Sequence, residues 1–150
     1  MLLLSLLLTE PQAGYSEGRS CVNSQIADSY LDGWRLRTAG AFEIEESDTR
    51  YYLVTLASTI EYKILACSDD AAEQIQLVVY NDSGRVLEVT EPDGRGADMT
   101  FSPPKSGSYF VGARVVQMAD IAEPETRKEK REAKKSGAPK VGVGLGIMYR

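Results

Sequence analysis

The chain has 150 residues, 43% of them hydrophobic and 26% charged, which is typical of one folded domain and too short for two ordinary ones. The net charge of −5, with its acidic excess in residues 14–122, argues against nucleic acid as a partner, because phosphate binding needs a basic surface. The chain has no histidine, which excludes Ser-His-Asp and Cys-His catalysis, histidine-ligated zinc and imidazole acid–base chemistry.

The N-terminus is a short leucine-rich run that ends in polar residues. Leu2–Leu8 is too short to span a bilayer, which needs about 20 residues. Such a run is typical of the apolar core of a secretory signal, with Ala13 as the small residue before the cleavage site. We therefore expect residues 1–13 to be a signal peptide and the protein to be exported, periplasmic or extracellular, with no membrane span. The alternative is a leucine-rich N-terminal strand.

Residues 20–37 have the apolar spacing of a helix, for which Ser20 or Asn23 can serve as N-cap. Gly40 is one predicted end, and Gly33 favours an earlier end near Leu31. The apolar residues that recur on one face are Val22, Ile26, Tyr30 and Trp34, with Ala27 and Leu31 beside them.

From residue 41 onward the apolar period changes to two. Asn81–Gly84 is a turn motif between two such stretches and predicts a hairpin. Short strands separated by turn residues indicate an antiparallel sandwich or barrel, so we expect an all-β domain over residues 14–122 with one N-terminal helix. The predicted strands are 41–45, 50–57, 60–67, 74–80, 85–90, 97–101 and 108–117.

The C-terminal part has two sections. Residues 123–139 are rich in charged, helix-forming residues without an apolar face, which predicts a charged linker or a solvated helix. In residues 140–150, Val141, Val143 and Leu145 alternate with glycines, which predicts a C-terminal strand whose bare face allows close approach of another backbone. This strand is either the last strand of the sandwich or a strand donated to a partner.

Two cysteines are present, Cys21 in the predicted helix and Cys67 at the end of an apolar strand. In an oxidising compartment they are expected to form a disulfide. The bond would fasten the helix to the sandwich.

Acidic residues in the predicted loops are the candidate metal ligands. Asp69, Asp70 and Asp82 offer hard oxygen ligands of the kind that calcium prefers, although their spacing matches no known calcium loop. We expect no other cofactor. Carboxylate pairs leave a hydrolase open as one function. The candidate binding aromatics are Trp34, Tyr51, Tyr52, Tyr62, Tyr80 and Tyr109, most of which should pack within the sandwich.

Several segments in residues 48–116 form a characteristic order of strands and turns: Tyr51–Ala57, Tyr62–Ala66, Ser68–Ala71, Gln76–Gly84, Thr100–Pro104 and Ser106–Val111. This order resembles the bacterial pre-peptidase C-terminal domain, a family similar to the collagen-binding domains of secreted collagenases. The resemblance implies a jelly-roll-like β-sandwich and a role as an accessory to exported enzymes.

The sequence thus predicts a non-enzymatic exported binding or accessory module that recognises a protein or a glycan. One alternative is a structural component of the envelope that self-associates through its C-terminal strand. The other is a carboxylate-based hydrolase.

Overall fold

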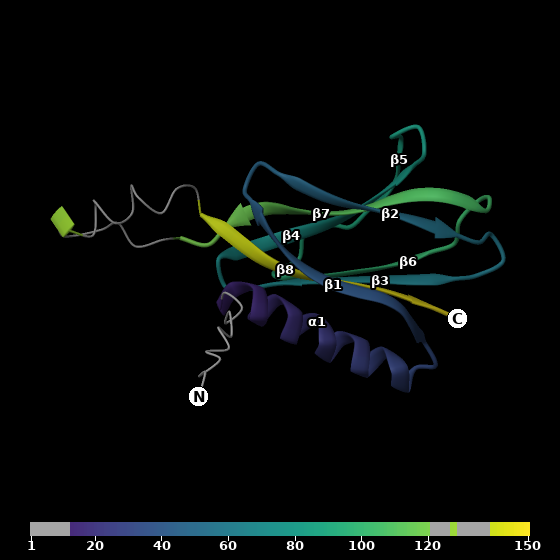
Figure 1. Ribbon diagram of the computed structural model, residues 1–150, viewed down its shortest axis with the longest axis horizontal. Helices are drawn as coiled ribbons and strands as arrows, with labels where there is room; N and C mark the ends of the chain where they lie inside the picture. The colour runs from purple at the N-terminus through teal and green to yellow at the C-terminus, as the bar shows by residue number, and fades with distance from the viewer. Residues whose placement is uncertain (1–12, 121–126, 129–138) are drawn as a thin grey trace, which may run out of the picture.

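The computed structural model describes residues 13–120, 127–128 and 139–150, which form one helix and eight strands (Figure 1). Helix α1 lies on one side of the molecule, against the first of two stacked sheets (Figure 1). The elements are α1 Ala13–Leu31, β1 Arg35–Glu45, β2 Thr49–Leu56, β3 Tyr62–Ser68, β4 Ala72–Asn81, β5 Val86–Val89, β6 Gly96–Phe101, β7 Gly107–Met118 and β8 Lys140–Tyr149.

Both sheets are four-stranded and antiparallel. The first has the order β1-β8-β3-β6 and the second has the order β2-β7-β4-β5. This is the strand order of a jelly roll, so the predicted all-β, jelly-roll-like sandwich is confirmed. The side chains between the sheets form the main core, which includes Ile64, Ile75, Leu77, Val111, Val143 and Ile147.

Helix α1 begins seven residues earlier than the sequence predicts and ends at Leu31, the earlier of the two predicted ends. Trp34 and Tyr30 therefore do not share its buried face: Trp34 lies after the helix, and Tyr30 is 46% exposed. Packing explains the early start, because Gly18 of α1 lies directly against the backbone of β8 and tertiary contacts outweigh the low helix propensity of glycine.

The predicted period-two strands are all present, and β1 is longer than expected. It begins at Arg35, where the side chains are exposed and have no apolar alternation. Pairing explains this extension, because Arg35 and Leu36 pair with Tyr149 and Met148 at the end of β8. Pairing with a neighbouring strand can thus form a strand where the sequence itself has no alternation.

The C-terminal strand is the last strand of the sandwich. β8 pairs with β1 on one edge and with β3 on the other, and Val141–Met148 is wholly buried. Self-association through this strand is therefore a wrong prediction, because a strand with both edges occupied has no backbone groups left for a partner. The bare glycine face is confirmed: it receives α1, which packs Val22 and Ile26 over Gly144 and Gly146.

Two predictions lie wholly or largely outside the described residues. These are the signal peptide at residues 1–13 and the charged linker at residues 123–139. Both stay predictions.

The predicted disulfide is confirmed: Cys21 of α1 is bonded to Cys67 near the end of β3, with a Cα–Cα distance of 5.7 Å. The bond lies beside a small second core between α1 and the first sheet. That core consists of Val22, Ile26, Trp34, Leu65, Cys67 and Met148.

Gly144→Ala should lower the free energy of unfolding by about 2 kcal/mol, because the added methyl group would overlap the carbonyl oxygen of Gly18 and lie 2.6 Å from Val22 Cγ1. Urea unfolding measures the change. Gly40→Ala, in the same sheet, is the matched control, since its nearest neighbour is 3.9 Å away. Equal stability of the two variants would contradict the close packing of α1 on β8.

Cys21→Ser should lower stability by about 4 kcal/mol on the chain-entropy estimate, since the bond joins residues 46 apart in the sequence. Thermal unfolding checks this, and amide exchange should show α1 opening before the sheets. Reduction of the unaltered protein should reproduce the loss. An unchanged melting temperature would mean that packing alone holds the helix.

Candidate functional site

The outer surface of the second sheet carries exposed apolar side chains, whereas α1 covers the outer surface of the first. Strand pairing places Tyr51 opposite Gly112 and Leu53 opposite Phe110, which in turn lies opposite Tyr80. Because side chains alternate between the two faces of a sheet, these residues share one surface. We call this surface the open face; its members are Tyr51, Leu53, Tyr80, Val86, Val89, Phe110 and Val116.

The centre of the open face is a pair of tyrosines on two strands that are not neighbours. Tyr51 on β2 and Tyr80 on β4 are separated by β7, yet their ring centroids are 5.2 Å apart in an edge-to-face arrangement. Gly112 makes this contact possible, because a methyl group there would lie 2.9 Å from Cδ1 of Tyr51. The ring of Tyr51 therefore lies across β7 where a side chain would otherwise stand.

The open face is largely apolar, with few free polar groups. The two tyrosine hydroxyl oxygens lie 3.5 Å apart. Arg114 donates from Nε to Oε1 of Gln76 at 2.9 Å, and Gln76 donates to the carbonyl oxygen of Thr90 at 2.7 Å. These polar side chains are thus bonded within the protein, and the exposed aliphatic groups remain for contact with a partner.

The turn between β4 and β5 forms one end of the open face. Oδ1 of Asn81 accepts hydrogen bonds from the backbone N–H groups of Ser83 and Arg85, an Asx turn that fixes the hairpin. Gly84 completes the turn with a φ of 82°. A shallow cavity of about 270 Å³ lies here, lined by Tyr51, Tyr80, Gly84 and Phe110.

A more polar cavity of about 420 Å³ lies beside the same turn, against the loop that leads into β7. Ser106 is fixed there by Ser58, whose backbone N–H donates to Ser106 Oγ at 2.9 Å. Tyr109 donates its hydroxyl to the carbonyl oxygen of Lys105. The open face therefore ends at a rigid polar rim.

Burial raises the pKa of Tyr80, and the hydrogen bond with Tyr51 and the charge of Tyr51 raise it further, while Arg114 acts in the opposite direction. Since the ordinary pKa of a tyrosine is 10.0, Tyr80 is neutral near pH 7. The hydroxyl at the centre of the open face is therefore uncharged there.

The structure separates Asp82 from the other two candidate calcium ligands. Asp69 is 4% exposed, and its carboxylate accepts hydrogen bonds from the backbone N–H groups of Ala71 at 3.0 Å and Gly142 at 2.9 Å. Asp70 is exposed at the same end of β4, whereas Asp82 lies beyond the other end, a ten-residue strand away. The Asp69 carboxylate thus has a structural role, because it joins the end of β3 to the start of β8.

Among the described residues, no three aspartate, glutamate or cysteine side chains lie together in a way that could hold a metal ion. The calcium site stays a prediction without geometric support.

The predicted binding aromatics divide clearly. Trp34, Tyr62 and Tyr109 are buried, so they are structural, and Tyr52 packs against the core beside Phe42. Tyr51 and Tyr80 lie on the open face. Sequence reasoning missed Leu53 and Phe110 as surface residues. Both residues lie within consecutive apolar runs, Tyr51–Val54 and Tyr109–Val111, so the alternation that would mark the outward side is hidden.

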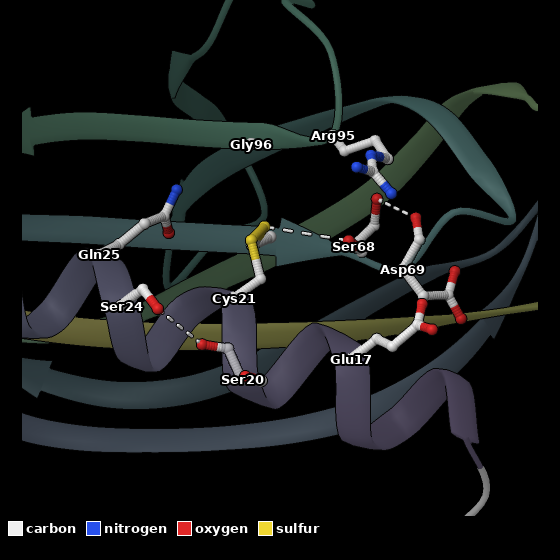
Figure 2. Close-up of a pocket in the computed structure, with 10 residues that line it drawn as sticks. Glu17, Ser20, Cys21, Ser24, Gln25, Ser68, Asp69, Arg95 and Gly96 are labelled. Carbon is white, nitrogen blue, oxygen red and sulfur yellow. Dashed lines mark hydrogen bonds between the residues drawn. A yellow bond between two sulfur atoms is a disulfide. The ribbon is translucent and has the colours of Figure 1, made fainter.

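A polar cavity of about 560 Å³ lies between α1 and the first sheet, next to the disulfide (Figure 2). Glu17 and Gln25 reach it from the helix and Arg95 from the opposite side (Figure 2). Two serine hydroxyls here are bonded within the protein: Ser24 donates to the carbonyl oxygen of Ser20, and Ser68 to that of Asp69. Within the described chain, Oε1 of Gln25 is the buried side-chain oxygen without a partner.

No helix in the described residues is long and apolar enough to cross a membrane.

Tyr51→Phe should lower the pKa of Tyr80, because the hydroxyl of Tyr51 raises it through a hydrogen bond and through its charge. The pKa should stay raised, since desolvation by the protein, the largest cause of the shift, remains. Site-resolved NMR titration of the tyrosine ring carbons measures it. An unchanged pKa would mean that the two hydroxyl groups do not interact.

Comparison with protein-family models and with curated proteins finds no match. Among solved structures, the pre-peptidase C-terminal domain of a Bacillus anthracis collagenase is 15% identical, with a TM-score of 0.49, over 75% of this chain and 89% of that one. Aeromonas hydrophila PliG, a periplasmic inhibitor of g-type lysozyme, is 12% identical, with a TM-score of 0.45, over 75% and 85%. Both TM-scores are below 0.5, so we infer neither a family nor a function from these similarities. Membership of the pre-peptidase C-terminal family stays a prediction.

Proposed function

We propose that this protein is a non-enzymatic, exported binding or accessory module that holds a partner protein on its open face. One observation supports this most directly: apolar side chains gather on a sheet surface, where Leu53 is 64% exposed and Tyr51 is 48% exposed. Contiguous exposed apolar surface of this kind marks an interaction site. Tyrosine is also among the residues that are enriched in the centre of such sites.

A protein partner fits the open face better than a glycan. The exposed apolar side chains of this face, besides Tyr51, are aliphatic: Leu53, Val86, Val89 and Val116. These groups gain free energy when they are buried against other apolar side chains. A glycan would instead need free hydrogen-bonding groups, and the Arg114 and Gln76 side chains are bonded to each other.

Export agrees with the disulfide, because a bond such as Cys21–Cys67 persists in oxidising compartments. A binding role agrees with the absence of histidine and with the structural use of the Asp69 carboxylate.

The test is capture of partners from periplasmic and culture-medium extracts of the native host, followed by titration of each captured protein. Leu53→Asp on β2 and Val86→Asp on β5 each place a charge on an exposed part of the open face. Each should weaken binding by about tenfold or more, since burying an unpaired charge in an interface is costly. Leu31→Asp is the matched control, because Leu31 is 88% exposed on α1, on the other side of the molecule.

A partner retained by the control and lost by both open-face variants supports the proposal. Equal binding by all three variants would place the site elsewhere. A glycan array probed with the same proteins tests the glycan alternative. Glycan binding that both open-face variants lose would mean that the partner is a glycan and not a protein.

A further inference from the structure

The sandwich has four edge strands, and they differ in how well they are protected. They are β1 and β6 in the first sheet and β2 and β5 in the second. An edge strand has unpaired N–H and C=O groups along one side, so it can pair with another strand. Natural edges avoid this by being short, by carrying charged residues or by β-bulges.

Three of the four edges carry such protection. β1 has a register shift between Leu36 and Thr38, and four of its residues are charged. β5 has four residues and a register shift against β4. β6 has six residues, with Asp98 exposed near its middle.

β2 is the exception. Its eight residues, Thr-Arg-Tyr-Tyr-Leu-Val-Thr-Leu, pair with β7 in unbroken register and contain no proline, glycine or lysine. Arg50 is its single charged residue, and β-branched and aromatic residues with high strand propensity fill most other positions. Within the described part of the chain, β2 pairs with β7 alone. Its outer edge is therefore unbroken and lacks the protection of the other three.

We propose that the outer edge of β2 pairs with β2 of a second copy of this chain, antiparallel and about a two-fold axis at Tyr52. The two four-stranded sheets would then form one continuous sheet of eight strands. In this register Tyr51 of one copy lies opposite Leu53 of the other on the outer surface, a cross-strand aromatic–aliphatic pair. The proposal is independent of the proposed function, since it needs no other partner.

The charges near β2 favour pairing with a second copy of this chain. The two Arg50 residues would lie four positions apart, about 14 Å along the strand direction, so they do not repel at close range. Exposed Glu46 and Asp48 precede β2, whereas exposed Lys105 lies in the loop beside Ser58, just beyond its other end. An antiparallel partner places the acidic end of one copy beside the basic end of the other, and opposite charges facing each other favour pairing.

The pairing would also extend the open face. Because both copies pair in the same sheet, their two open faces lie on the same side and meet along the β2–β2 line. An eight-residue strand spans about 27 Å, so the new contact is small and the dimer should depend on concentration. Two adjoining faces would bind a repetitive partner more tightly than one face does.

Sedimentation velocity of the purified protein over about a hundredfold range of concentration tests the proposal. The unaltered protein should shift from monomer to dimer. Leu53→Asp should weaken the dimer by about tenfold or more, since it makes the two aspartates diagonal neighbours across the axis. Val86→Asp, the same kind of change on β5 at the opposite edge of the sheet, should leave self-association unchanged.

Amide exchange at low and high concentration gives a second readout. The N–H groups on the outer edge of β2 should become protected as the dimer forms, while those on the outer edge of β5 should not. A monomer at every concentration would overturn the proposal. A dimer that Leu53→Asp leaves intact, or one without added protection in β2, would overturn it as well. Partner binding lost in both Leu53→Asp and Val86→Asp reports on the open face and not on this pairing.

Discussion

Strand β8 is the constraint on which the rest of the structure depends. β1 pairs with β8, and β3 pairs with the other edge of β8, so the first sheet exists as one sheet because this strand lies in its middle. Both ends of β8 are fixed. The Asp69 carboxylate accepts the N–H of Gly142, and Arg150 and Glu61 pair through their backbones and through a 2.8 Å ion pair.

Glycine serves two opposite faces of the molecule in the same way. In β8 the missing side chain at Gly144 lets the backbone of α1 approach the first sheet. In β7 the missing side chain at Gly112 lets Tyr51 cross the strand and meet Tyr80. The missing side chain at Gly144 allows the helix to cover the first sheet, and the missing side chain at Gly112 allows an exposed aromatic pair on the second. The difference lies in what occupies the space: a helix backbone fastened by Cys21–Cys67 in one case, a single side chain in the other.

Much of the fold could be predicted from the sequence, and the candidate site could not. Period-two alternation in stretches such as 74–80 predicts strands, because each buries one face in a single core. Alternation does not tell which sheet a strand joins, so β8 could be read as a donated strand until its pairing with β1 and β3 was known. Leu53 and Phe110 were missed for a related reason: their strands are apolar on both faces, and only the register shows which face is outward.

The position of β8 also determines when the protein can fold. Phe42 of β1 pairs with Val143 of β8, so the first sheet cannot close until almost the whole of residues 1–150 has been synthesised. Contacts between residues so distant in sequence form slowly, because a long loop must be ordered before they form. Until β8 is available, β1 and β3 lack the strand that joins them, and their unpaired edges are open to pairing with other strands.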